Sequence, residues 1–552
     1  MPVFRHAVAS FEPRATSVLL WTRLSGGATS TGWVLARDPT LTDVVAEGEV
    51  ATGPDLDHTV TVDVDGLEAG TAYWYRFDAG GESSPVGRTR TLPAGDGPLR
   101  LGLVACARFS VAPLGVYRAL AEREVDLVLH LGDYIYEDDG EKGVRSHEPP
   151  RACVSLADYR TRLAQHRRDP DCQALHLRHP MSLLIDDHDV ADNCWTTGAK
   201  AHDPDTQGPF ADRALAASRA RQEWVPSRLR DPADPTRTWR SFPVGDLAEV
   251  VLLDTRLSGR HRQAGDERDD VPGLDDPDRS LLGDDQRAWL AERLADTTRP
   301  WAIVATGVVV NDVTLPLPAA AGLIEPLLPN GYAALDGKIL HDDQWDGYPA
   351  ERERLVQGLQ RRARAGDGTA RTLVLSGDIH SSWAFVGPHD PVTGEPAAVE
   401  ATFPAVASKP MGRSRVPGAW RLLDASLRRL EHVPWVDVTE RGYGIVDLTP
   451  DTATVSWWFL QATASDPAAE AWPAAAFRTG RSGWPPRLER VPAEDLPTDP
   501  VRPGLPDPLP PRPADLARMR RSHLVRTAAA RGVGTLVPAL LVAAVRRTRR
   551  RR

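Results

Sequence analysis

Four short segments place side chains that can bind metal ions directly after apolar runs. The segments are ACAR with Cys106 and Arg108, GDYIY with Asp133 and Tyr136, IDDHDVADN with Asp186, Asp187, His188, Asp189 and Asn193, and SGDIH with Asp378 and His380. Singly, each is weak evidence, because acidic residues after strands often cap helices and a lone cysteine is usually a small buried hydrophobic residue. The repetition of this arrangement in one region favours a shared site.

The donor atoms indicate which ions such a site would hold. A thiolate, a phenolate, a carboxylate and an imidazole together suit a highly charged transition metal. The oxygens of Asp133, Asp187, Asp378 and Asn193 suit a hard ion such as calcium, magnesium or manganese. We therefore expect two unlike metal ions bridged by one carboxylate, a pair that can lower the pKa of a bound water and neutralise a transferring phosphoryl group.

Apolar runs in the middle of the chain must position these side chains. Six runs have the composition of strands that end in polar or small residues: LRLGLVACAR, EVDLVLHLGD, HPMSLLIDDHD, LAEVVLLDTR, RPWAIVATG and RTLVLSGDIH. Helix-like stretches lie between several of them, namely GVYRALAERE, FADRALAASRARQEWV and DDQRAWLAERLAD. This alternation predicts an α/β domain over residues 99–475, with helices on the faces of a largely buried sheet. A β-hairpin over residues 442–460 is expected to close it.

The first 95 residues have a different pattern. Short segments in which apolar and polar residues alternate are separated by turns of Gly, Pro and Asp. These strand-like segments are TSVLLWTRL, TGWVLARD, HTVTVDVDGL and TAYWYRFDAG. This spacing predicts an antiparallel β-sandwich of immunoglobulin or fibronectin type, followed by the linker PAGDGP at residues 93–98. The segment carries no catalytic signal, so we expect a packing or partner domain.

Length and charge limit the classes of protein to consider. The chain has 552 residues, more than one hydrophobic core usually serves, and its formal net charge is -10. An acidic body argues against nucleic-acid binding, which needs clustered positive charge. The body is therefore not expected to bind nucleic acid.

The cysteines and the beginning of the sequence suggest the compartment. Cys106, Cys153, Cys172 and Cys194 show no CxxC or zinc-finger spacing, although Cys153 and Cys172 could pair in an oxidising compartment. The first residues lack a charged leader followed by an apolar core. We expect a cytoplasmic protein with reduced thiols, peripheral to a membrane if its tail binds lipid.

The last part of the chain is rich in proline and arginine. Residues 480–552 are expected to form a tail that is disordered or weakly associated with a membrane surface. Within it, GVGTLVPALLVAAV at 532–545 is apolar for only fourteen residues, whereas a membrane-spanning helix needs about 20. The arginines around that segment favour weak contact with anionic lipid over a transmembrane span.

The order of the motifs resembles that of the metallophosphoesterases, whose signature is DxH, GDxxD, GNHE and GHxH. The sequence is most similar to their alkaline phosphatase D branch, in which a cysteine replaces the first aspartate, GDxxD becomes GDYIYE and GNHE becomes DDHE. Further similarity lies in VASFEPRATSVLLWTRL, DDQWDGYPAERERL and SGDIHSSW, and the resemblance runs from about residue 4 to 460. It implies a metallophosphoesterase core of mixed sheets flanked by helices.

Carried over residue by residue, the resemblance implies two metal sites. The ferric ion would lie on Cys106, Asp133, Tyr136 and His380. A second divalent metal, expected to be calcium, would lie on Asp133, Asp187 and Asp378 with Asn193 nearby, so that Asp133 bridges the two ions.

The same resemblance implies catalytic roles for three further residues. His188 would protonate the leaving oxygen or stabilise the developing charge, and Asp189 would orient that histidine. Arg108 would contact the phosphate. The neighbouring acidic residues Glu137, Asp138 and Asp139 are expected to form a solvated loop outside the site.

The sequence departs from the family pattern at one place. Between GNHE and GHxH the superfamily has a ligand histidine and the D branch commonly has glutamine-containing sequence. Here Val308 and Val309 stand where polar side chains are expected, with Asn311 as the nearest substitute. We expect this difference to affect the affinity for the second metal or the choice of substrate.

The leading hypothesis from the sequence is a phosphomonoesterase that attacks its substrate with a metal-bound hydroxide at a binuclear site. The first alternative is a phosphodiesterase with phospholipase-D-like activity. The second, from another class, is a metal-binding or adhesion protein whose phosphatase-like core is degenerate, which only Val308 and Val309 favour.

Overall fold

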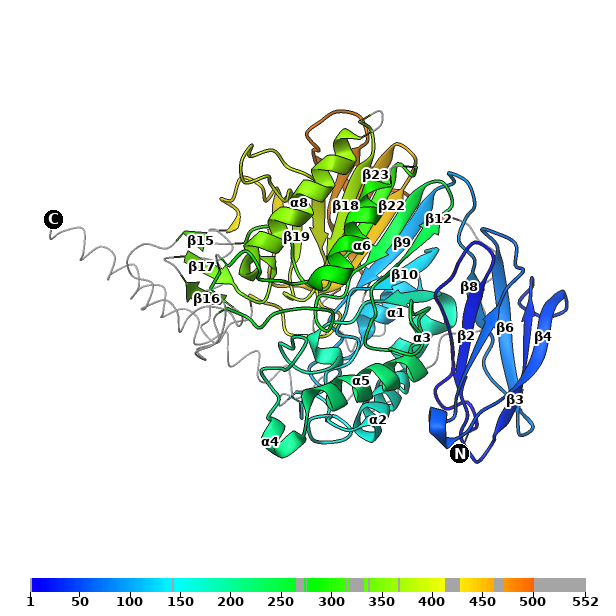
Figure 1. The fold of residues 1–552 in the computed structure, drawn as a ribbon. Helices are drawn as coiled ribbons and strands as arrows, with labels where there is room; N and C mark the ends of the chain where they lie inside the picture. The colour runs from blue at the N-terminus through cyan, green and yellow to red at the C-terminus, as the bar shows by residue number, and fades with distance from the viewer. Residues whose placement is uncertain are drawn as a thin grey trace, which may run out of the picture.

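Two large β-sheets packed face to face form the centre of the protein (Figure 1). The structure, a computed structural model, describes residues 2–140, 143–264, 273–274, 276–296, 298–313, 315–316, 332–335, 338–365, 368–412, 427–460 and 470–500. Within the expected tail, residues 480–500 are therefore described. The apolar segment 532–545 lies outside the described residues.

The first sheet has ten strands and carries three of the predicted site segments. Its strands, in spatial order, are β25 (Glu489–Arg490), β24 (Trp472–Gly480), β23 (Thr452–Leu460), β22 (Arg441–Leu448), β9 (Leu99–Val104), β10 (Leu127–His130), β11 (Met181–Leu183), β1 (Val8–Phe11), β2 (Val18–Arg23) and β5 (Thr59–Val64). Strands β9, β10, β11 and β1 are parallel neighbours, and the remaining pairings are antiparallel.

The second sheet has seven strands and carries the fourth segment. In spatial order they are β12 (Arg240–Val244), β13 (Ala248–Leu252), β14 (Trp301–Ala305), β18 (Arg371–Ser376), β20 (Val399–Thr402), β19 (Ser382–Val386) and β21 (Trp435–Asp437). Strands β13, β14, β18 and β20 are parallel. Each of the six strand-like runs predicted from the sequence contains one of the parallel strands β9, β10, β11, β13, β14 or β18, and the hairpin over 442–460 forms β22 and β23.

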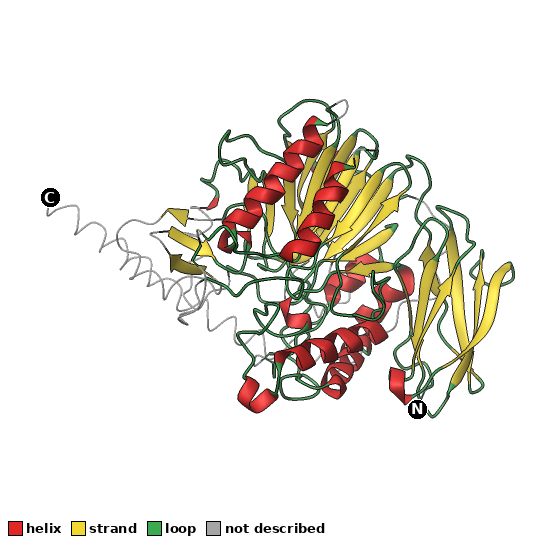
Figure 2. Cartoon of the chain, viewed as in Figure 1, coloured by secondary structure: helices red, strands yellow, loops and turns green. Residues whose placement is uncertain are grey.

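Helices cover the outer faces of both sheets, which gives four layers. Helices α1 (Gly115–Ala121), α2 (Leu156–Arg167), α3 (Pro170–Arg178) and α5 (Phe210–Trp224) pack on the ten-stranded sheet. Helices α6 (Gly283–Ala295) and α8 (Pro349–Arg364) pack on the seven-stranded sheet and lie across the front of the molecule in Figure 2. The short helix α4 (Pro204–Gln207) precedes α5. The mixed sheets with flanking helices agree with the α/β arrangement predicted for this part of the chain.

Local sequence determines where these helices begin. Ser155 and Asp158 form a capping box at the start of α2, in which each side chain binds the other residue's backbone amide. Asp169 caps α3 by accepting hydrogen bonds from the next turn, and Pro170 occupies the first helical position. The two caps place α2 and α3 in immediate succession over the parallel strands.

The strands of the first 95 residues are divided between two sheets. An antiparallel sheet contains β4 (Val44–Ala51), β3 (Ser30–Ala36), β6 (Ala72–Ala79), β7 (Glu82–Ser83) and β8 (Gly87–Arg90). Strands β1, β2 and β5 instead belong to the ten-stranded sheet, where Phe11 pairs with Met181. A hydrophobic cluster that includes Val8, Leu20 and Tyr75 joins the two sets of strands. The first 95 residues therefore share a sheet with the strands that precede Cys106, Asp133 and Asp187.

The described chain remains packed after residue 475. Strands β24 and β25 extend the ten-stranded sheet, and the Asp499 carboxylate then binds Arg100 and Arg123 at 2.8 and 2.7 Å. The part of the predicted tail between residues 480 and 500 thus belongs to the folded body. Among the described helices, none combines the length and the apolar character that crossing a bilayer requires.

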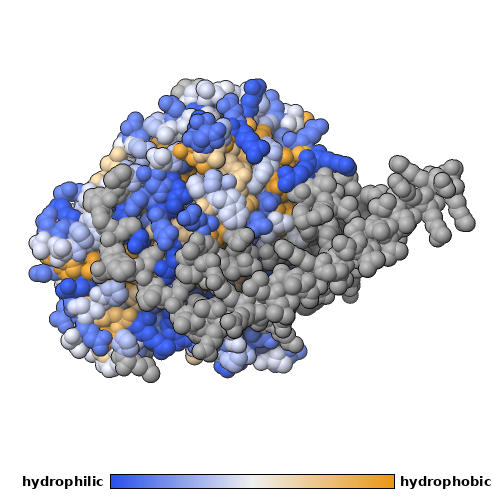
Figure 3. Space-filling view, turned by 180° about the vertical axis from the view of Figure 1, so that it is seen from behind, coloured by the Kyte–Doolittle hydropathy of each residue, from blue (hydrophilic) through white to orange (hydrophobic). Residues whose placement is uncertain are grey.

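A fourth sheet, the exposed surface and the cysteines complete the described part of the structure. A small antiparallel sheet contains β15 (Leu315–Pro316), β17 (Lys338–His341) and β16 (Tyr332–Leu335). On the face shown in Figure 3, hydrophilic residues make up much of the visible described surface, with small hydrophobic patches between them. All four cysteines are buried and free, so Cys153 and Cys172 are separate thiols.

Candidate metal centre

The four predicted segments meet at the carboxyl ends of parallel strands. Cys106 follows β9, Asp133 follows β10, Asp187 follows β11 and Asp378 follows β18. The first three strands belong to one sheet and β18 to the other. Because the two sheets pack face to face, the same ends of their strands converge, which is where open α/β folds keep their ligands.

An unusual backbone conformation marks these residues. Positive φ angles, rare for residues other than glycine, occur at Cys106 (58°), Asp133 (57°), Asn193 (50°), Asp378 (61°) and His380 (50°). All five are among the predicted metal ligands. Strained backbone at a cluster of polar residues is typical of functional sites, because the surrounding structure must hold each residue in place.

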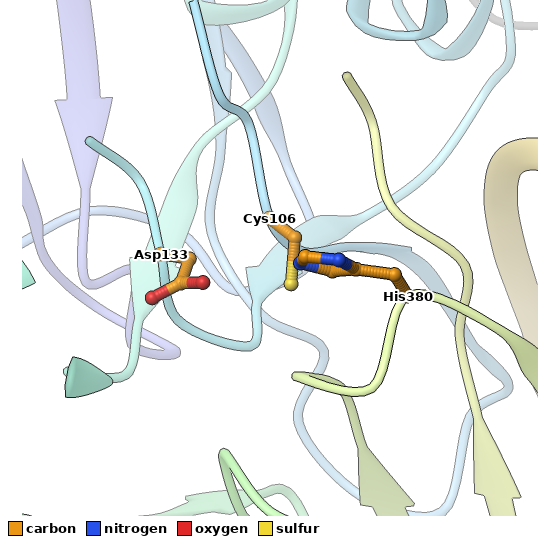
Figure 4. A group of neighbouring side chains, drawn as sticks. All are labelled: Cys106, Asp133 and His380. Atoms are coloured by element: carbon orange, nitrogen blue, oxygen red, sulfur yellow. The ribbon is translucent and has the colours of Figure 1, made fainter. Parts of the chain in front are cut away.

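Cys106, Asp133 and His380 form the first group of candidate ligands. One potential ligand atom from each lies within 4.8 Å of the others, and Figure 4 shows the His380 imidazole reaching toward the Cys106 sulfur with Asp133 beside them. The Tyr136 hydroxyl joins this group, donating to Asp133 Oδ2 at 2.7 Å and lying 3.1 Å from His380 Nε2. The structure thus brings together the four residues expected to hold a ferric ion.

Asp133 also belongs to a second group. Carboxylate oxygens of Asp133, Asp186, Asp187 and Asp378 lie within 4.8 Å of one another. Asn193 lies beside them, since its backbone amide donates to Asp187 Oδ2 at 2.7 Å. The expected ligands of the second metal are therefore adjacent, and Asp133 is common to both groups.

Electrostatics favour a cation between these side chains. Burial raises the pKa of Cys106, Asp133, Tyr136 and Asp378 well above the usual values, and a neighbouring carboxylate raises each of them further. Burial, together with the charge of His188, lowers the pKa of His380 to about 3, so His380 is neutral and able to bind a metal. A bound multivalent cation stabilises the deprotonated forms of such ligands.

Buried oxygen atoms without a hydrogen-bond donor provide a test of whether a metal fits. Asp186 Oδ2 and Asp187 Oδ1 are buried and make no hydrogen bond within the described part of the chain. The Cys106 sulfur has only a long contact of 3.8 Å with the backbone oxygen of Asp378. Carboxylate oxygens that accept no hydrogen bond, beside a thiol, a phenol and a neutral imidazole, are a suitable donor set for one soft and one hard ion.

Arg256 is a site residue that sequence reasoning missed. It is fully buried after β13, and its guanidinium contacts Asp186 and lies 2.9 Å from Asp343, 3.6 Å from Asp187 and 3.7 Å from Asp378. Although burial raises the pKa of Asp187, Arg256 and the other neighbours lower it below its usual value. The segment LLDTR, a polar residue pair after an apolar run, carried a signal like that of the four predicted segments.

His188 contacts Glu137, which corrects two expectations. The His188 Nδ1 atom lies 2.8 Å from Glu137 Oε2, and only 1% of the Glu137 side chain is exposed. Burial alone lowers the pKa of His188, but Asp187, Glu137 and Asp133 outweigh it and raise this pKa well above its ordinary value. Glu137, predicted to be solvated, is therefore the residue that orients His188.

Asp189 has a different role from the predicted one. Its carboxylate accepts hydrogen bonds from the backbone amides of Asp133, Tyr134, Ile135 and Asp186 at 3.0–3.3 Å. These amides use both of its oxygens, so Asp189 joins the loop after β10 to the loop after β11. The expectation that it orients His188 is wrong, because its charge is directed toward backbone amides.

Arg108 lies above the Tyr136 ring, with 4.8 Å between its guanidinium carbon and the ring centroid. The same guanidinium contacts the Asp138 carboxylate, which is 27% exposed. Asp138 is thus tied to the site margin and is not part of a freely solvated loop, whereas Asp139 is exposed as predicted. Arg108 therefore lies beside the first ligand group.

Two further polar residues support the ligands. Gln344 donates from Nε2 to Asp378 Oδ2 at 2.5 Å, and its Oε1 accepts from the Val309 amide at 2.6 Å. Ser408 donates to the Tyr136 hydroxyl at 2.7 Å and contacts the Cys106 carbonyl oxygen at 2.9 Å. Gln344 falls in the motif DDQWDGYPAERERL, which was noted without a role, whereas Ser408 carried no signal.

The structure explains why Val308 and Val309 stand where the family pattern has polar side chains. Both side chains are fully buried in hydrophobic clusters, and Asn311 donates to Glu400 at 2.8 Å in a separate buried pair. Asn311 is therefore not a substitute ligand. Gln344, held by the Val309 backbone, supplies a polar side chain at this place.

Comparison with known proteins agrees with this architecture. A model of the PhoD-like phosphatase family matches residues 101–457, and a model of the family's N-terminal domain matches residues 1–93. Alkaline phosphatase D of Bacillus subtilis (strain 168) is 33% identical over 404 residues, which are 69% of this chain and 65% of that protein. The chain thus spans less than two thirds of that relative.

A solved structure of PhoD gives the corresponding result in three dimensions. It superposes with a TM-score of 0.76 at 27% identity and covers 95% of this chain and 98% of the other. The two family models together match most of the sequence. This chain belongs to the PhoD-like phosphatase family.

Proposed function

We propose that the protein is a metal-dependent phosphoric ester hydrolase that acts on phosphate monoesters at a binuclear site. The observation that carries this proposal is the position of Asp133, whose carboxylate belongs to both groups of candidate ligands. A shared carboxylate is what a pair of closely spaced ions needs, because it can bind one ion with each oxygen. The alkaline phosphatase D relative supports the same reaction class.

The two groups would hold different ions. Cys106, Asp133, Tyr136 and His380 would hold Fe(III), for which a phenolate and a thiolate are suitable donors. Asp133, Asp187 and Asp378, with Asn193 nearby, would hold a divalent ion, and calcium suits their oxygen atoms. Such a metal pair supplies an activated water and neutralises charge on the phosphoryl group.

His188 and Arg108 would act on the substrate itself. The Glu137 carboxylate on Nδ1 stabilises the protonated imidazole, so His188 would donate a proton to the leaving oxygen. Glu137 on Nδ1 and the Tyr136 ring, whose centroid is 4.2 Å away, fix the plane of this imidazole. Arg108 would contact a phosphate oxygen and exchange its bond with Asp138 for that contact.

The fold supports a more specific architectural assignment. We infer a metallophosphoesterase core in the four layers formed by the two sheets and their helices, and a β-sandwich in the first 95 residues. The supporting observations are the parallel strand ends that carry the ligands and the hydrophobic cluster that joins the antiparallel sheet to β1, β2 and β5.

Visible absorption tests the iron assignment. A phenolate bound to Fe(III) gives the purified protein a broad visible band, and Tyr136→Phe abolishes it because the phenolate is the absorbing ligand. Tyr443→Phe is the matched control, since the Tyr443 hydroxyl contacts Arg123 and none of the candidate ligands. A colourless, iron-free enzyme with full activity would refute the assignment.

The substrate preference needs a separate measurement. Turnover of p-nitrophenyl phosphate should exceed turnover of bis-p-nitrophenyl phosphate if the enzyme is a monoesterase. The reverse order identifies a phosphodiesterase and rejects the proposed monoester preference.

We also propose weak membrane contact by the tail. The basic residues near its end would bind anionic lipid by charge attraction. Because β25 and Asp499 are packed, the deletion that tests this idea removes only residues 501–552. Equal binding of the full and shortened chains to phosphatidylserine vesicles would dismiss it.

A further inference from the structure

We propose that Arg167 is the centre of a buried binding site for a small monovalent anion, with chloride as the ligand available in cells. The site lies between strands β1 and β2 and helices α2 and α3, separate from the metal centre. It follows from a fully buried guanidinium that has no acidic partner within the described chain, surrounded by polar side chains with unused hydrogen-bonding atoms.

Arg167 differs from the other arginines among the most deeply buried side chains. Arg88 pairs with Glu124 and Arg256 with Asp343, while Arg162 and Arg213 donate to backbone carbonyl oxygens. Arg167 is 0% exposed. Its guanidinium lies near the Tyr134 hydroxyl and the Cys172 thiol, but none of its three nitrogens meets both the distance and the angle of a hydrogen bond to a described residue. Its guanidinium lies 4.5 Å from the Trp21 ring centroid, a contact that leaves the in-plane N–H groups unused.

A buried guanidinium without a counter-charge is costly. Arginine stays protonated in proteins, and an isolated buried charge needs a partner of opposite sign. The polar neighbours Tyr134 and Cys172 do not supply one, because burial raises the pKa of Tyr134 well above its ordinary value and that of Cys172 to about 11. Both are neutral near pH 7, so the negative charge must come from solution.

Other buried groups around Arg167 offer neutral donors. Atoms without a hydrogen-bond partner in the described chain are His6 Nδ1 and Nε2, His166 Nε2, His176 Nδ1, Ser10 Oγ and Tyr75 OH. Arg167 is close enough to His6, His166 and His176 that its charge helps lower the pKa of each imidazole, after burial as the main cause. Neutral imidazoles each keep one N–H, which can point at an anion.

The geometry limits the kind of anion. His6, Ser10, Tyr75, His166 and His176 are each at most 3% exposed, so the ligand must lose its water when it enters. Phosphate and sulfate carry more charge than one guanidinium can balance, and their desolvation is far more costly than that of a halide. A chloride ion on Arg167 with neutral N–H and O–H donors matches both the charge and the burial.

A site of this kind would link the beginning of the chain to the end of helix α2. His6, Ser10 and Trp21 belong to the first strands or precede them, whereas His166 and Arg167 end α2. We therefore expect halide binding to stabilise the fold without entering the reaction, since a ligand that binds only the folded state raises its stability.

The first test is thermal unfolding of the full-length protein at constant ionic strength with chloride replaced by gluconate. The melting temperature should rise with chloride along a saturable curve, and bromide should act in the same way. Arg167→Met should remove the saturable part. Arg88→Met is the matched control, because it removes a buried arginine that has a carboxylate partner and should keep the chloride response. A response to chloride that is unchanged in Arg167→Met overturns the proposal.

A second test does not require the Arg167 variant to fold. In crystals of the unmodified protein grown in sodium bromide, anomalous scattering should locate a bromide within hydrogen-bond distance of the Arg167 guanidinium. His6→Leu should weaken the apparent chloride affinity by about tenfold, the loss expected for one buried hydrogen bond. Ordered water alone at Arg167, or bromide only on the protein surface, rejects the anion site.

Discussion

Glu137 and His188 meet at 2.8 Å, although one follows β10 and the other follows β11. The contact uses Nδ1 of the imidazole, which leaves Nε2 to face other groups, and Asp192 Oδ1 lies 3.8 Å from that atom. A carboxylate on one ring nitrogen fixes the tautomer and plane of a histidine that acts through the other. In the proposed mechanism, this pair makes Glu137 the residue that positions His188 for proton donation.

Glu137→Gln should lower turnover about 10–100-fold, the usual cost of removing an orienting carboxylate. The charge of Glu137 contributes to the raised pKa of His188, so its removal lowers that pKa. His188 then loses its proton at a lower pH, and the alkaline limb of the pH–rate profile moves to lower pH. Steady-state kinetics across pH measure both effects.

Asp139→Asn is the matched control for this experiment, because Asp139 lies in the same loop but is exposed. It should retain the turnover and the pH profile of the unmodified enzyme. A Glu137→Gln variant with an unshifted alkaline limb would show that Glu137 does not act through His188.

Asp189→Asn should reduce stability more than chemistry. The carboxylate accepts four backbone amides and an amide side chain offers only one oxygen, so we expect a loss of about 2–3 kcal/mol in the free energy of unfolding, the range for hydrogen bonds to a charged group. Urea unfolding measures this loss. The alkaline limb of the pH–rate profile should stay in place, and a shift like that of Glu137→Gln would restore Asp189 to the orienting role.

Asp133→Asn and Asp187→Asn should differ in the metals that they retain. Asp133 belongs to both ligand groups, so its replacement should release both ions and abolish turnover. Asp187 belongs only to the second, so its replacement should lower the divalent metal content and keep the visible absorption. Elemental analysis and absorption spectra of the two variants measure this contrast. Retention of both ions by Asp133→Asn would show that the sites do not share that residue.

Sequence patterns were sufficient for the features that depend on neighbouring residues. The apolar runs before Cys106, Asp133, Asp187 and Asp378 predicted the strands, and the rule that parallel strands expose their carboxyl ends on one side predicted that these residues meet. The first 95 residues were harder, because pairing of Phe11 with Met181 joins distant segments and leaves no local pattern.

The wrong or missing predictions at the site also concern contacts between segments that are distant in the sequence. Glu137 stands in the run EDD, which has the composition of a solvated loop, and its burial depends on the path of the loop after β11. Arg256 and Gln344 reach the ligands from strands and turns far along the chain. Sequence spacing predicts the metal-binding side chains that follow a strand. It does not predict which distant side chain packs against them.

Glu12 and Arg240 provide a pH-dependent contact between the beginning of the chain and the seven-stranded sheet. Their side chains are 1% and 3% exposed, and two hydrogen bonds of 2.6 and 3.1 Å join them. Burial alone raises the pKa of Glu12, but Arg240 outweighs it and lowers this pKa to about 2. Because the folded-state pKa is depressed, the pair stabilises the protein above the ordinary glutamate range and loses that effect as the pH falls from about 4.5 to about 2.

Glu12→Gln should therefore remove part of the acid dependence of stability. The shift corresponds to about 3 kcal/mol at neutral pH, since one pKa unit equals about 1.4 kcal/mol. We expect the variant to be less stable by about that amount at pH 7, because it leaves Arg240 buried without a counter-charge, and to approach the unmodified protein near pH 2.5. Urea unfolding at a series of pH values measures the difference.

Asp63→Asn, which removes the exposed partner of Arg228, is the control and should change stability by less than about 1 kcal/mol at every pH. A constant difference between Glu12→Gln and the unmodified protein from pH 7 to pH 2.5 would mean that Glu12 titrates normally and that the pair carries no pH-dependent stability.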